Sequence, residues 1–148
     1  WKDFEQAVPE FAARVKALFD GTKHKTIATL RADGSPRISG IETQFTDGEL
    51  TFGSMPDARK GADLKRDPRF ALHCTSADPE EGKEAAWAGD AKVSGRAVHA
   101  GELDGEASGD LFRADLDSVV ITGLNAEATL LVIRSWTPDG GVKVVERT

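Results

Sequence analysis

A cluster of basic residues in the middle of the chain gives the strongest indication of chemistry. The segment GSMPDARKGADLKRDPR follows a predicted strand that ends at Gly53. Ser54 has the type and position of a helix N-cap, with Asp57 as its capping-box partner. Arg59 and Lys60 then fall in the first turns of that helix, where free backbone N–H groups and the helix dipole also attract anions. This pattern predicts a phosphate-binding site, although a solvated helix face would carry the same two cations.

The charge distribution favours a small anionic ligand over a polyanion. The chain has 148 residues, with 19 Lys and Arg against 25 Asp and Glu, a net charge of −6 and a pI near 5.1. Such an acidic chain argues against sequence-independent binding of nucleic acid. Residues 57–69 nevertheless hold five basic residues against three acids, whereas residues 78–90 hold five acids and Lys83 as their one base. A basic spot on an acidic protein suits the capture of a small anion.

The histidine and cysteine residues indicate structural roles. His24, His73 and His99 lie far apart and lack the short spacings of metal ligands. Cys74 follows His73 on a predicted strand, so the two side chains would point to opposite faces and could not form a catalytic pair. We therefore interpret His73 as a polar strand residue and Cys74 as a small buried hydrophobe. One cysteine also excludes a disulfide framework.

Most of the chain has the pattern of strands, so a sheet must position the basic cluster. Apolar residues at three- and four-residue spacing predict one helix over residues 3–21. Asp33-Gly34 and Asp47-Gly48 separate three β-rich runs and predict two hairpins. A helix near residues 55–66 must end before Pro68. Further strands are predicted in the runs RFALHCTS, DAKVSGRAVHAG, SVVITGL, ATLLVIRSW and GVKVVER.

The remaining segments add no second domain. Residues 102–117 hold six acids with Arg113 as their one base, and we expect a polar excursion with a short helix over 109–114. The chain has no apolar run of about 18 residues for a membrane span. Nothing near Trp1 has the layout of a signal peptide, so we expect a cytoplasmic protein. Without linkers or repeats, we predict a single domain over residues 1–148, whose antiparallel sheet closes into a barrel to remove its edges.

The stretch TIATLRADGSPRISGIETQFTDGELTFGSMPDARKGADLKRDPRFALHC resembles the core of the pyridoxamine phosphate oxidase-like superfamily, the flavin-binding split barrels. Two marks carry the resemblance: the hairpin TLRADGSPR and, at the expected distance, the run ARKGADLKRDPR. The N-terminal helix and the ending VIRSWTPDGGVKVVER are similar to those of the actinobacterial branch, which uses FMN or the deazaflavin coenzyme F-420. The resemblance implies a mainly β (α+β) fold, a Greek-key split β-barrel of about six antiparallel strands with an N-terminal helix and a short helix near residues 55–66, working as a homodimer.

The resemblance also implies a set of cofactor-binding residues. These are Arg59, Lys60, Gly53, Ser54, Met55, Arg37, Ser39, Ile41, Asp90 and Lys92. The first two match residues that hold the cofactor phosphate. Gly53 and Ser54 match the strand end along the ring and ribityl chain, and residues 37–41 match the strand beneath them. In the family the strand with Asp90 and Lys92 reaches the cofactor from the partner subunit.

Departures from the family pattern bear on the activity. Ser39 and Gln44 stand where the vitamin-processing oxidases have basic residues, and their C-terminal Arg-x-His motif is absent. Pyridoxamine phosphate oxidase activity is therefore not expected. We predict instead an FMN- or F-420-dependent oxidoreductase that transfers a hydride to or from a small organic substrate. Ser39, Ile41, Met55 and the partner's Val93 would line a moderately hydrophobic substrate pocket.

Other functions fit the same residues. No residue stands out as a general acid or base, because the cofactor ring itself would do the chemistry. One alternative is a non-catalytic protein, either a cofactor carrier or a haem-binding split barrel with His73 or His99 as the ligand. Another is a structural or regulatory dimer whose site is vestigial.

Overall fold

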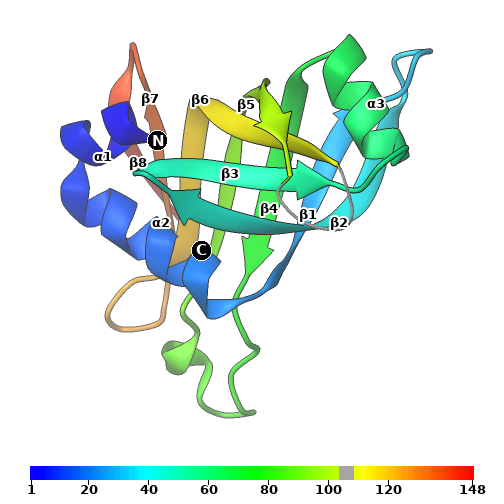
Figure 1. The fold of residues 1–148 in the computed structure, drawn as a ribbon. Helices are drawn as coiled ribbons and strands as arrows, with labels where there is room; N and C mark the ends of the chain where they lie inside the picture. The colour runs from blue at the N-terminus through cyan, green and yellow to red at the C-terminus, as the bar shows by residue number, and fades with distance from the viewer. Residues whose placement is uncertain (104–108) are drawn as a thin grey trace.

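A closed antiparallel barrel dominates the computed structural model, which describes residues 1–103 and 109–148 (Figure 1). Its strands are β1 (His24–Leu30), β2 (Pro36–Thr46), β3 (Glu49–Ser54), β4 (Arg69–Thr75), β5 (Asp90–Glu102), β6 (Asp110–Leu124), β7 (Leu131–Thr137) and β8 (Gly141–Arg147). Neighbouring strands follow the order β3-β2-β1-β4-β5-β6-β7-β8, and β3 also pairs with β6. This extra pairing closes β1 to β6 into a six-stranded barrel, which confirms the predicted fold class. The strands β7 and β8 continue the sheet beyond β6.

The two hairpins form where the Asp-Gly pairs predict them. Asp47 and Gly48 have φ angles of 52° and 77°, and Gly34 has a φ angle of 84°. Glycine adopts this left-handed backbone without steric cost, and aspartate tolerates it, so these pairs reverse the chain tightly. Leu30 consequently pairs with Pro36 across the first hairpin.

The first helical segment differs from the single helix predicted over residues 3–21. It is divided into α1 (Lys2–Ala7) and α2 (Pro9–Gly21), with Val8 between them in a non-helical conformation, φ −142° and ψ 69°. The proline ring of Pro9 disfavours a helical conformation in the preceding residue, and its nitrogen cannot donate a hydrogen bond. The apolar spacing therefore continues across a break that the proline imposes.

Aromatic side chains join these helices to the barrel. The ring centroids of Trp1 and Phe4 lie 5.2 Å apart, and those of Phe4 and Trp136 lie 5.0 Å apart. Trp1 also meets Phe45 of β2 with 4.7 Å between centroids. All but Phe45 are nearly inaccessible to solvent, so burial of their large apolar surfaces holds the helices against the sheet.

A buried lysine secures the end of α2. Lys25 is 5% exposed, and its Nζ donates hydrogen bonds to the carbonyl oxygens of Phe19, at 2.6 Å, and of Thr22. The last carbonyl groups of a helix have no partner within the helix. Lys25 satisfies them from the first barrel strand and thereby ties α2 to β1.

The short helix predicted over residues 109–114 is wrong. Strand β6 begins at Asp110 and runs without interruption to Leu124. Within it Phe112 and Ala114 point inward and are buried, while the acids Asp115 and Asp117 alternate with buried positions. Asp115 and Asp117 are on the solvent-facing side of a strand that pairs with β5 and, over residues 110–113, with β3. Residues 104–108 of the predicted excursion lie outside the described residues.

None of the helices in the described part of the chain has the length and apolar character to cross a membrane.

Candidate functional site

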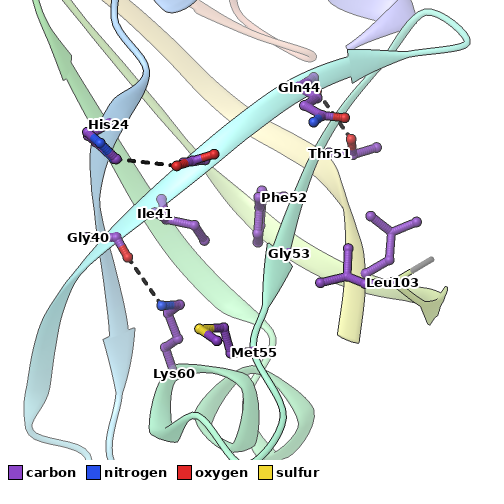
Figure 2. A pocket seen from close by; sticks show the side chains of 12 residues that line it. His24, Gly40, Ile41, Gln44, Thr51, Phe52, Gly53, Met55, Lys60 and Leu103 are labelled. Atoms are coloured by element: carbon purple, nitrogen blue, oxygen red, sulfur yellow. Dashed lines mark hydrogen bonds and ion pairs between the residues drawn. The ribbon is translucent and has the colours of Figure 1, made fainter. Parts of the chain in front are cut away.

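A pocket of about 420 Å³ opens between β2 and β3 (Figure 2). We refer to it as the cradle, bounded by Gly40, Ile41, Gly53, Met55, Lys60 and Leu103. Ile41 and Phe52 lie between the two strands at the back of the pocket, and both are nearly inaccessible to solvent. Most of the polar lining residues, among them His24, Gln44 and Thr51, were not predicted from the sequence as site residues. They come together because β1, β2 and β3 pair side by side.

Lys60 lies at the rim of the cradle. Its Nζ donates a hydrogen bond to the carbonyl oxygen of Gly40 at 3.2 Å, across from the helix that carries it. An ammonium group has three donors, so two remain for an anionic ligand. Met55 beside it is 68% exposed, which is unusual for a thioether and leaves an apolar surface at the mouth.

Gly61 allows α3 to lie close to the end of β3. A Cβ atom on Gly61 would lie 2.4 Å from the Oγ of the buried Ser54, so a side chain there would push the helix away from the strand. A Cβ atom on Gly53 would lie 2.8 Å from a methyl carbon of Leu103, whose flexible side chain would have to move.

The helix near the cradle is shorter than predicted and is capped differently. It is α3 (Arg59–Arg66), and its N-cap is Ala58, without a side-chain cap. Ser54 is buried at the end of β3, and its Oγ donates to the carbonyl oxygen of Met55 at 3.2 Å. Asp57 has a φ angle of 58°, which belongs to a turn. The predicted capping box of Ser54 and Asp57 is therefore wrong, because a turn over residues 55–58 separates the strand from the helix.

Arg59 and Lys60, adjacent in the sequence, line different depressions. Arg59 lines a second depression of about 440 Å³ between α3 and the β1–β2 hairpin. We call it the arginine notch, since its lining includes Arg31, Arg37, Arg59 and Arg66. Successive residues of a helix point about 100° apart, which explains the divergence. The structure therefore groups Arg37 with Arg59 and groups Lys60 with Gly53, Met55 and Ile41.

A buried carboxylate organises the arginine notch. Asp63 is 2% exposed and accepts hydrogen bonds from Thr29 Oγ at 2.8 Å, Arg37 Nε at 2.6 Å and Arg66 Nη2 at 3.0 Å. Burial alone would raise the pKa of Asp63, but the hydrogen bonds from Arg37, Thr29 and Arg66 outweigh it and lower the pKa to about 2. Asp63 is thus a permanent anion that holds two guanidinium groups in place. Its burial was not predicted from the sequence.

Asp90 and Lys92 belong to a third region on the outer face of the barrel. This outer groove is lined by Thr26, Ala28, Ile38, His73, Lys92 and Val120, among others. His73 Nε2 shares a hydrogen bond with Asp90 Oδ2 at 3.0 Å, while the Oδ1 atom of Asp90 is buried without a hydrogen-bond partner among the described residues. Within one chain, Asp90 and Lys92 are therefore apart from the cradle.

Cys74 and His73 are neighbours on β4, where the sequence predicts that their side chains point to opposite faces. Cys74 is fully buried and contacts the carbonyl oxygen of Leu18 through its Sγ at 3.2 Å. His73 faces the outer groove instead. The alternation of a strand separates the two, as predicted.

Ser39 lies on β2 between a residue of the arginine notch and a residue of the cradle. Alternation places Arg37, Ser39 and Ile41 on one face of the strand, and Ile38 and Gly40 on the other. Ser39 itself is not among the residues that line the two depressions.

A closed six-stranded antiparallel barrel with a pocket at β2 and β3 and a basic helix beside it is the architecture of a split β-barrel. The sequence matches the Pyridoxamine 5'-phosphate oxidase family over residues 11–140. The chain belongs to this family. No curated protein matches it significantly.

Solved structures show the same fold. An FMN-binding, pyridoxamine 5'-phosphate oxidase-related protein from Nostoc punctiforme is 10% identical with a TM-score of 0.64, covering 98% of this chain and 96% of that one. PhzG from Burkholderia lata, in complex with tetrahydrophenazine-1-carboxylic acid, is 14% identical with a TM-score of 0.62, covering 97% and 89%. A heme binding protein from Mycobacterium smegmatis is 15% identical with a TM-score of 0.57, covering 91% and 86%. At these identities the likeness concerns the fold.

Proposed function

We propose that the chain binds FMN or coenzyme F-420 in the cradle and acts as an oxidoreductase that moves a hydride to or from a small organic substrate. The observation that carries the proposal is the cradle, an apolar pocket of about 420 Å³ with Lys60 at its rim. Membership of the Pyridoxamine 5'-phosphate oxidase family supports it. The direct test is to titrate the purified chain with each cofactor and compare the two affinities.

The residues of the cradle fit a flat, apolar ring with an anionic tail. Gly53 has no side chain, so β3 offers bare backbone that a planar ligand can approach closely. Met55, Leu103 and Leu111 provide apolar contact area, and Lys60 provides hydrogen bonds to a phosphate. When bound, the ring supplies the hydride chemistry. The chain's own residues bind the ring, orient it and exclude water from one of its faces.

We further propose that the active form is a homodimer joined through the outer groove. Ile38 is 75% exposed, and it lies among Ala28, Thr26 and Val120 on the outer face of the sheet. An isoleucine this exposed within an apolar groove is typical of an interface. Ile38 and Gly40 lie two residues apart on the same face of β2, so a second copy seated on the groove would also border the cradle. Asp90 and Lys92 could then reach the cofactor of the partner subunit.

The homodimer predicts a specific response to charge in the groove. Replacing Ile38 with glutamate is expected to produce a monomer at micromolar concentration, because a carboxylate would be buried without a partner. Val144→Glu on β8 is the control, since Val144 is likewise an exposed apolar strand residue, at 51%, but lies outside the groove. Sedimentation of both variants measures the effect. A wild-type chain that sediments as a monomer contradicts the dimer and the inter-subunit site together.

The lining of the cradle predicts the kind of substrate. Ile41 and Met55 are apolar, whereas His24, Glu42, Gln44 and Thr51 also line the cradle, so we expect moderately hydrophobic compounds that carry a polar group. With reduced cofactor, the protein should reduce unsaturated or quinone-like acceptors faster than free cofactor does. The measurement is an anaerobic panel of acceptors with free cofactor as the control. If no acceptor reacts faster than in the control, the protein is a cofactor carrier.

Haem binding is a second candidate function, and His73 is the observation that favours it. Its imidazole is 43% exposed, borders the largely apolar outer groove and is held by Asp90 at 3.0 Å. A carboxylate that bonds one ring nitrogen orients the other for a metal. His99 is engaged differently, with its Nε2 bonded to Asp110 Oδ1 at 2.8 Å. Because a second copy on the groove would cover His73, this candidate competes with the dimer.

A haem titration separates the two candidates. If haem binds through His73, its visible absorption should shift on mixing with the wild type and with His99→Ala but lose the shift with His73→Ala. If the flavin proposal is correct, FMN or F-420 binds and all three proteins respond alike to haem.

A further inference from the structure

An imidazole and a carboxylate lie at the end of the cradle away from Lys60. His24 is the first residue of β1, and Glu42 lies directly opposite it on β2 (Figure 2). Strand residues rise about 3.3 Å each, so Glu42 lies about 7 Å along β2 from Gly40, whose carbonyl oxygen accepts the hydrogen bond of Lys60. The cradle therefore has a cationic end and, further along β2, a second polar end.

The His24 ring is open to solvent and faces the carboxylate. Its Nδ1 lies 3.8 Å from Oε1 of Glu42, which is ion-pair distance when the ring is protonated. Both side chains are more than half exposed, at 75% and 54%. A carboxylate at one ring nitrogen orients the other. Because Glu42 faces Nδ1, the Nε2 atom on the other side of the ring is available to a ligand in the cradle.

Two lysines lie close to His24 in the sequence, and both are placed outside the cradle. The Nζ of Lys23 is 3.6 Å from the same oxygen of Glu42, and Lys23 does not line the cradle. Lys25 is buried on the opposite face of β1. Among the described lining residues, His24 is the one histidine, and histidine gains and loses a proton near neutral pH. It is therefore the lining residue suited to proton transfer.

Reduction of a carbon–carbon double bond needs a proton as well as a hydride. An acceptor whose double bond is conjugated to a carbonyl gains a hydride at one carbon atom, and the displaced π electrons leave an enolate. A proton must then form the second C–H bond, and a positioned side chain accelerates such a transfer. Over both steps the acceptor gains two electrons and two hydrogens, while the reduced cofactor that supplies the hydride is oxidised by two electrons.

We propose that His24 is the catalytic residue that donates this proton. The inference rests on the proposed function, and it specifies the acceptors as compounds with a double bond conjugated to a carbonyl. The Nε2–H bond of the protonated ring breaks as the new C–H bond of the acceptor forms. The neutral ring then regains a proton from water, to which it is exposed. An anionic tail bonded to Lys60 leaves the polar end of the cradle for the acceptor.

Anaerobic oxidation of the chain loaded with reduced cofactor by cyclohexenone tests the step. His24→Gln should slow the reaction by about a hundredfold, a typical loss for a missing general acid, and should keep the cofactor affinity of the wild type. The wild-type rate should decline as the pH rises through neutrality, because the ring loses its proton, and the variant should lack this decline. Added imidazole should restore part of the variant's rate.

His99→Gln is the matched control. It is the same substitution at a side chain that is 46% exposed but does not line the cradle, so the rate and its pH dependence should equal those of the wild type. The side chain of His24 is more exposed still, so its variant should fold normally.

A binding measurement without turnover addresses the same residue. A phenolate resembles the enolate, so para-cyanophenol should bind to the chain with oxidised cofactor and move the ring-nitrogen NMR signals of His24 but not those of His99. His24→Gln should bind this phenol about tenfold more weakly, the typical effect of one charge-assisted hydrogen bond. Phenol binding that leaves the His24 signals unchanged contradicts the proton-donor role.

The outcomes separate this inference from the proposed function. If His24→Gln keeps the wild-type rate and pH dependence, His24 is not the proton donor and the flavin function stands. If the variant loses cofactor affinity in the same proportion as rate, His24 binds the cofactor and the inference is again overturned. If the wild type binds neither FMN nor F-420, the proposed function fails, and the role of His24 fails with it.

Discussion

Replacing Lys60 with alanine is expected to weaken binding of the flavin or deazaflavin by about tenfold or more. A charge-assisted hydrogen bond to a phosphate contributes roughly 1.5 to 3 kcal/mol, and each 1.4 kcal/mol is a factor of about ten in affinity. The thermal midpoint of the cofactor-free protein should hardly change. In that state the bond from Lys60 to Gly40 is exposed to solvent and adds little to stability.

Lys65 provides a control on the same helix. Its Nζ pairs with Asp110 Oδ2 at 2.9 Å and does not line the cradle. Lys65→Ala should therefore keep the cofactor affinity of the wild type. Fluorescence titration of both variants with FMN and with F-420 gives the comparison. Normal cofactor binding by Lys60→Ala would assign Lys60 to a solvated helix face and remove its role in the cradle.

Replacing Asp63 with asparagine is expected to lower the free energy of unfolding by about 2 to 3 kcal/mol. The substitution removes the negative charge that Arg37 and Arg66 share, and it leaves buried donors without an ionised acceptor. Urea unfolding at neutral pH measures the loss. Asp20→Asn is a suitable control, because Asp20 pairs with Lys16 at the surface and such a pair contributes little.

The same residue predicts how stability depends on pH. The pKa of Asp63 is about 2 in the folded chain against 3.8 as its ordinary value. A lowered pKa means that the unfolded chain takes up the proton first. The stabilisation, about 2 kcal/mol, is therefore complete above pH 4 and lost as the pH falls from about 4 to about 2. Asp63→Asn should flatten this part of the unfolding curve against pH, and a variant as acid-sensitive as the wild type would contradict the assignment.

The sequence alone was sufficient for the local structure of the barrel. The Asp-Gly pairs reverse the chain because glycine tolerates a positive φ angle, and Pro68 ends α3 because its ring restricts the preceding residue. Alternating apolar residues indicate strands because one face of a sheet must be buried. These are interactions between residues close in the chain. They also explain one local error, since Pro9 divides the first helix although the apolar spacing continues.

Contacts between distant residues were decided by the tertiary structure. Residues 110–117 have the composition of a loop, yet they belong to β6 because they pair with β5 and, over residues 110–113, with β3 to close the barrel. Asp63 has the residue type of an exposed helix position. It is buried because the β1–β2 hairpin places Thr29 and Arg37 within hydrogen-bond distance of its carboxylate. In the sequence Arg59 and Lys60 form one predicted phosphate-binding pair. In the structure α3 is packed so that Lys60 lines the cradle and Arg59 lines the arginine notch. Periodicity states which residues share a face, whereas the packing of that face against other elements depends on the whole fold.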